Sequence, residues 1–427
     1  METLKKILYF PIASYFKFFA QIRLRKWNPK IVVVTGSSGK TTLLHLIESQ
    51  IGERARFSHH ANSSYGIPFD ILDLHRETLQ PSEWLTLFLQ APSAAFRASP
   101  KENIYVVEAD CDRPGEGKFL SELLRPDIVL WLNVSRTHSM NFDELVSQKR
   151  FANVDEAIAY EFGYFVENCS QVAMINGDLQ LEINQEKRTK TTIVEVTKEK
   201  YLDSYKINER ETTFTIQQQR YSFDALLPQD VFYSIAMCKA AIKSLGLEFD
   251  PTFKKLVLPP GRSTVFHGIK STTLIDSSYN ANLESIKAML SMFAEIFEKK
   301  KWVVLGDMLE LGKEEKDEHE KLAELLAKFS FERIILIGPR MEKYTYPQLD
   351  KMTKKTKHIN FYPKGQRKIV ILDMQRELTG GEVVLFKGSQ SLLLEGIIEE
   401  LLENKKDSNK LPRREQIWKD KRAKLLD

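Results

Sequence analysis

The stretch from Val34 to Thr42 contains the residue types that most directly predict chemistry. It reads Val34-Thr35-Gly36-Ser37-Ser38-Gly39-Lys40-Thr41-Thr42 and joins an apolar run to a helical pattern. Glycines let a backbone wrap a polyphosphate with its N–H groups, Lys40 can neutralise β- and γ-phosphate oxygens, and the Thr41 hydroxyl can ligate Mg²⁺. The spacing Gly-x-x-Gly-Lys-Thr is two residues shorter than the general P-loop pattern, and it predicts an ATP or GTP site. The alternative is a tight turn with a solvent-facing lysine. The residues expected to hold the nucleotide here are Gly36, Ser37, Ser38, Gly39, Lys40, Thr41 and Thr42.

Strand-like apolar runs alternate with helical patterns around this loop, which predicts a parallel α/β fold. Residues 31–34 form the expected buried strand before the loop, and residues 41–51 the helix after it. Residues 104–107 and 128–134 are expected to be two further central strands. Active groups in open α/β sheets lie at the carboxyl ends of such strands. Between about 191 and 223, short β-rich runs predict a small antiparallel addition to the first domain.

A second α/β unit is expected after Pro259-Pro260-Gly261, a breaker that suits an interdomain hinge. Its strands are expected near residues 273–275, 302–305, 334–337 and 383–386. The predicted organisation is therefore an aromatic and basic helical segment over 1–30, a central P-loop parallel-sheet ATPase domain over 31–258, a smaller Rossmann-like α/β domain over 259–404, and a basic tail over 405–427.

Composition excludes several classes of protein. The 427 residues include 62 Lys and Arg against 58 Asp and Glu, and this net charge of +4 is too small to imply nucleic-acid binding. Hydrophobic residues at 42% and charged residues at 28% exclude a mostly disordered chain or one with many membrane spans. The three cysteines form no CxxC pair, which is typical of a reducing compartment. We expect a cytoplasmic monomer whose basic ends are solvated.

The segment from Ile7 to Ile22 is apolar and aromatic, but Pro11 and Lys17 interrupt it. It is also shorter than the ~20 residues that a bilayer span requires. The simplest interpretation is a helix packed on the first domain. The alternative is peripheral membrane contact through residues 1–27, with aromatic side chains inserted and basic ones near the headgroups. The side chains concerned are Phe10, Tyr15, Phe16, Phe18 and Phe19, with Lys5, Lys6, Arg23 and Arg25.

The phosphate loop resembles that of the Mur ligase family, ATP-dependent amide-forming enzymes with a shortened Thr-Gly-x-x-Gly-Lys-[Ser/Thr] loop. Further similar strings extend the resemblance from about Ile31 to Leu402. Those in the first domain are Asn62-Ser63-Ser64-Tyr65-Gly66-Ile67-Pro68, Val107-Glu108, Pro114-Gly115-Glu116, Arg125-Pro126-Asp127-Ile128 and Asn133-Val134 with His138. Those in the second resemble the MurF type, which adds D-alanyl-D-alanine to a UDP-muramoyl tripeptide. They are Gly261-Arg262, Ile275-Asp276-Ser277-Ser278-Tyr279-Asn280-Ala281-Asn282, Leu305-Gly306-Asp307-Met308-Leu309-Glu310-Leu311-Gly312 with His319, and Lys387-Gly388-Ser389.

The resemblance implies a chemistry and a set of roles. A carboxylate would be phosphorylated by ATP, and an amine would then displace the phosphate. Lys40 and Mg²⁺ would neutralise the phosphate oxygens. The implied metal ligands are Thr41, Glu108 and His138. Arg262 would contact the phosphates, Asp276 the ribose or a lysine network, and Asn280 the nucleotide. The implied catalytic residues are Lys40, Glu108, His138 and Arg262, with ATP and Mg²⁺ as cofactors.

Three departures from the family pattern concern the substrate, the metal and the base. The family usually begins with a separate domain that holds a UDP-sugar, whereas about 30 residues precede the phosphate loop here. Phe162 stands where many members have a lysine that becomes a metal-bridging carbamate, and Glu161 or Glu156 could substitute. The adenine-contacting string falls on Pro228-Gln229-Asp230 and Ser234 without its His and Asn, and Gln390 replaces the arginine after Lys-Gly-Ser.

The leading hypothesis is an ATP-dependent carboxylate–amine ligase that acts on small peptide or amino-acid substrates through an acyl phosphate, in cell-wall peptidoglycan precursor synthesis. One alternative is a divergent ligase for a lipid-linked or non-UDP substrate. The other is a nucleotide-binding scaffold without turnover.

Overall fold

The computed structural model describes residues 2–59, 61–76, 81–296, 300–353, 358–414 and Trp418. Two compact units divide the chain. The first unit comprises residues 1–135, 141–203 and 232–257, and the second comprises 136–140, 204–231 and 258–427. Most of the first unit lies before the predicted boundary near residue 258, and most of the second unit lies after it. Residues 204–231 are an exception, because they group with the second unit rather than the first.

The first unit contains a six-stranded sheet in the order β2-β3-β1-β4-β5-β6, with every neighbouring pair parallel. Its strands are β1 (Lys30–Thr35), β2 (Ala55–Ser58), β3 (Ile104–Ala109), β4 (Ile128–Trp131), β5 (Val172–Asn176) and β6 (Thr192–Val196). β1 is buried from its second residue onward, as expected for a parallel strand covered on both faces. It lies between β3 and β4, so the loop after β1 opens at the point where the strand order reverses, the usual ligand-binding position of such sheets.

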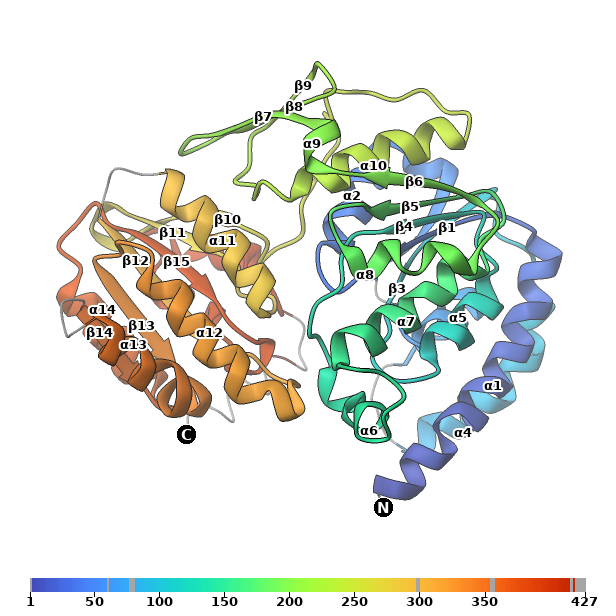
Figure 1. The fold of residues 1–427 in the computed structure, drawn as a ribbon, viewed down its shortest axis with the longest axis horizontal. Helices are drawn as coiled ribbons and strands as arrows, with labels where there is room; N and C mark the ends of the chain where they lie inside the picture. The colour runs from blue at the N-terminus through green and yellow to red at the C-terminus, as the bar shows by residue number, and fades with distance from the viewer. Residues whose placement is uncertain are drawn as a thin grey trace. The chain divides into compact units, whose positions relative to one another are not determined.

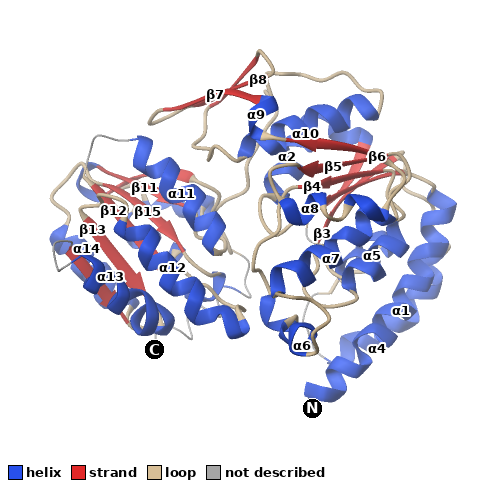
Figure 2. Ribbon diagram, viewed as in Figure 1, coloured by secondary structure: helices blue, strands red, loops and turns tan. Residues whose placement is uncertain are grey.

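Helices and strands alternate along this unit (Figure 2). The helices are α1 (Glu2–Trp27), α2 (Lys40–Ile51), α3 (Gly66–Leu72), α4 (Pro81–Ala95), α5 (Glu116–Leu124), α6 (Asp143–Ser147), α7 (Val154–Glu167), α8 (Gln180–Ile183), α9 (Lys198–Tyr201) and α10 (Val231–Ser244). Residues of α1, α3, α4, α5 and α7 share one apolar core with one face of the sheet, and α2 and α10 lie on the other face (Figure 1).

The N-terminal helix α1 is packed on the first unit, as the simplest interpretation of the sequence expects. Phe16 is fully buried, the Tyr15 hydroxyl donates to the Phe88 carbonyl at 2.8 Å, and the Trp27 indole N–H donates to the Glu102 carbonyl at 2.6 Å. Of the five aromatic residues considered for membrane insertion, Phe18 is the one that is exposed, at 59%. Among the described residues, no helix is both long and apolar enough to cross a bilayer.

The second unit contains a six-stranded sheet in the order β10-β11-β15-β12-β13-β14, in which only β10 is antiparallel to its neighbour. Its strands are β10 (Thr264–Gly268), β11 (Thr272–Asp276), β12 (Lys301–Gly306), β13 (Arg333–Ile337), β14 (His358–Tyr362) and β15 (Val383–Lys387). Its helices are α11 (Leu283–Ile296), α12 (Glu315–Ala327), α13 (Tyr346–Thr353), α14 (Arg367–Glu377) and α15 (Glu395–Leu401). The four strands expected from the sequence correspond to β11, β12, β13 and β15.

Two segments differ from the sequence interpretation. The β-rich stretch expected to form one antiparallel addition from residue 191 divides in two. Its first part, β6, joins the parallel sheet of the first unit, and its second part forms a separate sheet of β7 (Leu202–Ile207), β8 (Thr212–Ile216) and β9 (Gln219–Phe223). The expected basic tail begins with a short 3-10 helix, Lys405–Lys410, and then buries Leu411 and Arg413 in the second unit, because both side chains find partners there.

Candidate functional site

The phosphate loop follows β1 and has a backbone that requires glycine at two positions. Gly36 has φ +125° and Gly39 has φ +82°, conformations that L side chains rarely adopt. A Cβ at Gly36 would also lie 3.0 Å from the backbone N and O of Asn133. These two glycines therefore let the loop pass close to the segment after β4 and turn into α2.

Ser37 and Ser38 brace this loop against the segment after β4. The Ser37 N–H donates to the Asn133 carbonyl at 3.1 Å, and its hydroxyl accepts from the Ser135 N–H at 2.8 Å. The Ser38 N–H donates to the Asn133 side-chain oxygen at 2.9 Å. Both serines are predicted from the sequence to bind the nucleotide, and their contacts in the structure also fix the shape of the loop.

Lys40 is the first residue of α2, and its side chain is buried under the loop. Its ammonium lies 2.6 Å from an Asp110 carboxylate oxygen and donates to the Gly36 carbonyl at 2.5 Å. Burial, the largest influence, lowers the pKa of Lys40, but the carboxylates of Asp110 and Glu108 outweigh it, so the pKa lies above its usual value. Lys40 is therefore a fixed cation at a helix N-terminus, where N–H groups without intrahelical partners also attract anions. Asp110 was not identified from the sequence, although it lies two residues after Glu108.

Thr41 and Glu108 bring two oxygen ligands together beside Lys40. The Thr41 hydroxyl donates to a Glu108 carboxylate oxygen at 3.0 Å, and Glu108 is in register with Val34 on the neighbouring strand β1. The Glu108 N–H donates to the Ser58 hydroxyl at 3.0 Å. A hydroxyl and a carboxylate next to a fixed cation are the donor set that a magnesium–polyphosphate complex requires. Thr42 follows in the first turn of α2.

Glu116 ties together two of the family-like strings in the first unit. Its fully buried carboxylate accepts from the Ser64 N–H at 2.8 Å, from the Ser64 hydroxyl at 2.7 Å and from the Asp112 N–H at 3.0 Å. The Tyr9 hydroxyl of α1 also donates to it at 3.2 Å. This carboxylate therefore holds the segment before α3 against the start of α5, and α1 contributes to the same network.

His138, a predicted metal ligand, lies in the second unit, whereas Glu108 lies in the first. Its Nδ1 pairs with a carboxylate oxygen of Glu310, and this hydrogen bond from His138 holds the pKa of Glu310 below its usual value. Both residues have positive φ, +53° for His138 and +63° for Glu310. Arg136 binds the same region through Glu314 at 2.7 Å and Glu318 at 3.0 Å. The joint binding of one metal by Glu108 and His138 stays a prediction.

A buried polar cluster lies at the carboxyl ends of the neighbouring strands β11 and β15. Asp276 is fully buried, and its Oδ2 has no hydrogen-bond partner among the described residues. The Lys387 ammonium donates to the Asn280 carbonyl at 3.0 Å, and the Arg262 guanidinium lies 4.5 Å from the centre of the Tyr279 ring. The predicted residues Arg262, Asp276 and Asn280 therefore belong to one region of the second unit, and the buried Oδ2 of Asp276 is suited to a ligand hydroxyl.

Burial shifts two pKa values in this cluster in opposite directions. Burial raises the pKa of Asp276 to about 6, although hydrogen bonds from Ser278 oppose the shift. Burial also lowers the pKa of Lys387 to about 7, and the positive charge of Arg262 lowers it further. Both groups can therefore change protonation near neutral pH, which is a property of binding and catalytic sites.

Arg413 supports this cluster and was missed by the sequence analysis, which placed it in a solvated tail. Its Nη2 lies 2.6 Å from Glu395 Oε2 and its Nε 2.8 Å from Glu395 Oε1, and both side chains are almost completely buried. It also donates to the carbonyls of Ser278 at 2.9 Å and Tyr279 at 3.0 Å. The sequence signal, a pair of adjacent arginines in a basic stretch, gave no indication of this role.

The structure corrects one expectation about the segment with Phe162. Phe162 lies on α7 and is buried, with its ring centre 5.9 Å from that of Trp131. The sequence analysis treated Glu161 as a possible metal ligand, but its carboxylate is buried and accepts from the N–H groups of Gly115 at 2.7 Å and Gly117 at 3.0 Å. The Glu161 carboxylate therefore binds the N–H groups at the start of α5. Glu156, the other candidate, accepts a hydrogen bond from the Ala152 N–H at 3.1 Å.

Comparisons with known proteins agree with this arrangement. The family model described as "Mur ligase middle domain" matches residues 34–229, and the one described as "Mur ligase, glutamate ligase domain" matches residues 261–390. The chain therefore belongs to the Mur ligase family, and it is an ATP-dependent peptide ligase that forms ADP.

The similarity is to proteins of the MurF type. The chain is 26% identical to the UDP-N-acetylmuramoyl-tripeptide--D-alanyl-D-alanine ligase of Escherichia coli (strain K12) over 392 residues, covering 88% of this chain and 77% of that protein. It is 23% identical to the enzyme of the same name from Bacillus subtilis (strain 168), covering 90% and 78%. A crystal structure of MurF ligase from Thermotoga maritima in complex with ADP shares the fold, with a TM-score of 0.72, 22% identity, and coverage of 93% of this chain and 84% of that one.

Proposed function

We propose that the protein joins a muramoyl-peptide carboxylate to an amine dipeptide of the D-alanyl-D-alanine type, as a cytoplasmic step in peptidoglycan precursor synthesis. A carboxylate oxygen of the acyl substrate attacks the γ-phosphorus of ATP, and ADP leaves. The amine nitrogen then attacks the acyl carbon, loses a proton and displaces inorganic phosphate. The buried Lys40, which pairs with Asp110, and the hydrogen-bonded Thr41 and Glu108 at the phosphate loop support this proposal most directly.

Each predicted site residue receives a role in this proposal. Lys40 binds the β- and γ-phosphate oxygens in place of its contact with Asp110 and Gly36. Thr41 and Glu108, with His138, would hold Mg²⁺, which would supply positive charge to neutralise the phosphate oxygens. Arg262 contacts the phosphates, and Asp276 accepts a hydrogen bond from a nucleotide hydroxyl.

One observation favours a second candidate. The buried aromatic ring of Phe162 cannot become the anionic carbamate that many family members use to bridge metals. A divergent ligase with a single metal and a lipid-linked or non-UDP acyl substrate is consistent with that difference, and so is a nucleotide-binding scaffold without turnover.

The experiment is a screen of ADP release by the purified protein with ATP and Mg²⁺. The acyl substrates are a UDP-muramoyl tripeptide and a lipid-linked muramoyl tripeptide, and the amines are D-alanyl-D-alanine, glutamate and other amino acids, with product masses as the second readout. Lys40→Ala should reduce turnover at least ~100-fold, because one preorganised charge at the reacting phosphate has that value. Lys190→Ala, at an exposed position in the same unit, is the matched control.

The outcomes separate the three candidates. Amide product from the UDP-linked substrate supports the proposal, and product from the lipid-linked substrate alone assigns the divergent ligase. Nucleotide binding without ADP release from any pair of substrates would overturn the proposal in favour of the scaffold. Unchanged turnover in a folded Lys40→Ala variant would contradict the role of the phosphate loop.

A further inference from the structure

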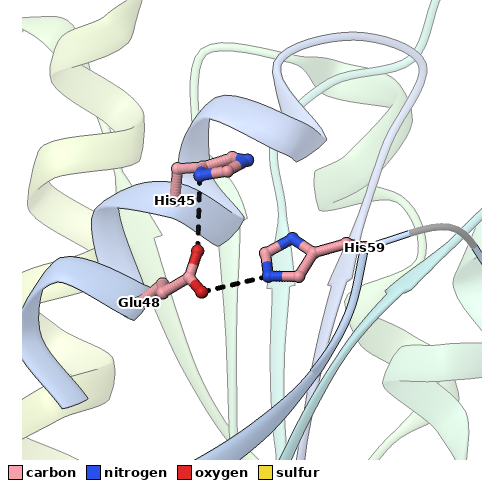
Figure 3. Close-up of side chains that lie close together, drawn as sticks. All are labelled: His45, Glu48 and His59. Atoms are coloured by element: carbon pink, nitrogen blue, oxygen red, sulfur yellow. Dashed lines mark hydrogen bonds and ion pairs between the residues drawn. The ribbon is translucent and has the colours of Figure 1, made fainter. Parts of the chain in front are cut away.

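Two imidazoles and a carboxylate meet beside the phosphate-loop helix, at a place that the proposed ligase reaction does not use. His45 and Glu48 are three residues apart on α2, which places them on one face of the helix, and His59 follows directly after β2. One ligand atom from each of the three residues lies within 4.8 Å of the others. Figure 3 shows the Glu48 carboxylate lying between the two rings.

The separations match those of a metal site. His45 Nδ1 lies 3.3 Å from one Glu48 oxygen, and His59 Nε2 lies 3.0 Å from the other. In a tetrahedral site with bonds of ~2.0–2.1 Å, neighbouring ligand atoms are roughly 3.3 Å apart, which is close to these two separations. The rings are also supported by their neighbours, because the His59 ring stacks on Phe57 at 5.9 Å and lies 5.2 Å from the His45 ring.

The donor set identifies the class of metal. Magnesium prefers six oxygen ligands, whereas two imidazole nitrogens and one carboxylate suit Zn²⁺ and its neighbours such as Co²⁺ and Ni²⁺. The three side chains are 19%, 37% and 31% exposed for His45, Glu48 and His59, so ions can reach the cluster and water can complete the coordination. The site is thus chemically distinct from the Thr41–Glu108 pair.

We propose that His45, Glu48 and His59 bind one transition-metal ion, of which Zn²⁺ is the physiological form. The ion links the end of β2 to α2. His45 lies one helical turn after Thr41, and the strand that ends before His59 supplies the Ser58 hydroxyl that accepts from the Glu108 N–H. Metal binding therefore joins the helix that follows the phosphate loop to the strand whose Ser58 contacts Glu108. It requires neither ATP nor a peptide substrate.

The test is metal binding by the full, tag-free chain after treatment with a chelator, without nucleotide. Zn²⁺ stoichiometry is measured by dialysis and elemental analysis, and Co²⁺ is used as a probe because tetrahedral coordination gives intense visible absorption. We expect one equivalent in the unchanged protein and at least ~10-fold weaker binding in His45→Ala and in His59→Ala. His75→Ala, an exposed histidine in the same unit, should bind as the unchanged protein does.

Two results would overturn this metal site. One is equal Zn²⁺ binding by all four proteins, and the other is loss of binding in Glu108→Ala with no loss in His45→Ala. Circular dichroism checks the fold of each variant, and Glu48→Gln provides a further ligand change that keeps the side-chain shape. Failure of this proposal leaves the ligase proposal intact, because ADP release is measured separately.

A second, independent observation concerns the outer surface of α1 and α4. Six exposed apolar side chains lie on these helices or directly after them, among fourteen exposed large hydrophobic residues in the described chain. They are Ile7 (64%), Leu8 (41%), Phe18 (59%), Leu85 (66%), Leu89 (72%) and Phe96 (68%), here named the α1–α4 surface. Leu85 and Leu89 are four residues apart and therefore share one face of α4, and Phe96 follows directly after that helix. The two helices lie side by side (Figure 1), joined by the Tyr15–Phe88 hydrogen bond.

Positive charge accompanies this apolar surface. Residues 7–27 and 83–97 contain five lysines and arginines and one acidic residue, Glu83. Lys17 pairs with Glu122 and Arg23 with Asp73, while Arg25, Lys26 and Arg97 are exposed. The Lys26 ammonium donates to the carbonyls of Phe96 and Arg97, so it lies at the C-terminal end of α4. Exposed apolar side chains bordered by cations fit the surface of an anionic bilayer.

We propose that the α1–α4 surface binds the surface of an anionic membrane, with its apolar side chains at the acyl boundary and its cations at the headgroups. The test is co-sedimentation of the full chain with vesicles of phosphatidylcholine alone or mixed with phosphatidylglycerol. Binding is expected only to the mixed vesicles, and it should weaken as salt is added. Leu89→Ser and Phe18→Ser should each weaken binding roughly tenfold, because each removes a large apolar side chain from the contact.

The matched control is Leu372→Ser, at a position that is 64% exposed on α14 in the second unit, and it should bind as the unchanged protein does. Equal binding by all variants would overturn the assignment of this surface. Absence of binding to the mixed vesicles, or self-association that Leu89→Ser abolishes, would overturn the membrane as its partner.

Discussion

Replacing Arg413 by alanine tests whether the last described part of the chain holds the second unit together. The Arg413–Glu395 pair has two short contacts, 2.6 and 2.8 Å, and side chains only 5% and 0% exposed. Removing the arginine leaves a buried carboxylate without its partner and frees the carbonyls of Ser278 and Tyr279. Breaking a buried pair in this way costs ~3–5 kcal/mol. For a unit of this size each kcal/mol lowers the melting temperature by roughly 2–4 °C, so we expect a fall of roughly 6–20 °C.

The assay is thermal and urea unfolding of the full chain, followed by circular dichroism. Lys410→Ala is the control, because it breaks a neighbouring but exposed ion pair with Asp407 and should cost no more than ~1 kcal/mol. The double variant Arg413→Met with Glu395→Leu should be more stable than Arg413→Ala, because an apolar pair leaves no buried charge. A loss below ~1 kcal/mol in Arg413→Ala would refute the reasoning, since a solvated tail residue would behave in that way.

Four further outcomes are expected. The contribution of Asp276 to the free energy of unfolding should fall as pH rises from about 4 through about 6, because the folded state favours its neutral carboxyl. Asp276→Asn should remove up to ~3 kcal/mol of that fall, measured by urea unfolding at each pH, and identical pH profiles would contradict the shifted pKa. Glu161→Gln should destabilise the first unit by ~1–3 kcal/mol, because an amide oxygen cannot serve both N–H groups, and an unchanged midpoint in urea would disprove this role. Glu108→Ala and His138→Ala should each raise the Mg²⁺ requirement more than the ATP requirement, so a shift in the ATP requirement alone would remove them from the metal site. Added bicarbonate should not stimulate ADP release, since Phe162 cannot be carbamylated, and a CO₂ adduct on a nearby lysine would show the opposite.

The sequence predicts the strands of the two central sheets well, because buried parallel strands are short, continuous apolar runs. Residues 31–34, 104–107 and 302–305 all fall within observed strands. It predicts the edge elements poorly. β10 and β14 lie at the edges of the second sheet, where β10 exposes alternate residues and β14 buries only its last residue, so the apolar signal is weak.

The phosphate loop could be identified from residue type and spacing, whereas its supporting contacts could not. Lys40 and Thr41 meet Asp110 and Glu108 because β1 and β3 are neighbours in register, and strand order is a property of the whole sheet. Arg413 shows the same limit more strongly. It lies 18 residues from Glu395 and more than 130 from Ser278, so no local pattern could connect it to the Asp276 cluster.

The family-like strings specify packing at least as much as chemistry, which is why they identify the fold better than the substrate. Asp307, within the Leu-Gly-Asp-Met string, accepts hydrogen bonds from the N–H groups of Arg340 at 3.1 Å and Met341 at 3.0 Å. It therefore fixes the start of the helical segment that begins at Met341. His319 is fully buried, and its ring accepts from the Met308 N–H at 3.2 Å while its Nδ1 contacts the Glu315 carbonyl at 2.7 Å. Burial lowers the pKa of His319, so the neutral ring that this arrangement needs is also the favoured form.

A substrate, by contrast, is recognised by side chains that can contact it without breaking the hydrogen bonds that hold the fold together. In the first unit the carboxylates of Glu116 and Glu161 are buried and accept hydrogen bonds from backbone N–H groups, so they hold the fold together. The Thr41–Glu108 oxygens and the buried Asp276 Oδ2 can contact a ligand without the loss of a backbone hydrogen bond that these oxygens make as acceptors from other residues of the predicted sites. Variants that distinguish acyl substrates should therefore be sought around these groups rather than within the longest family-like strings, where substitutions will alter stability first.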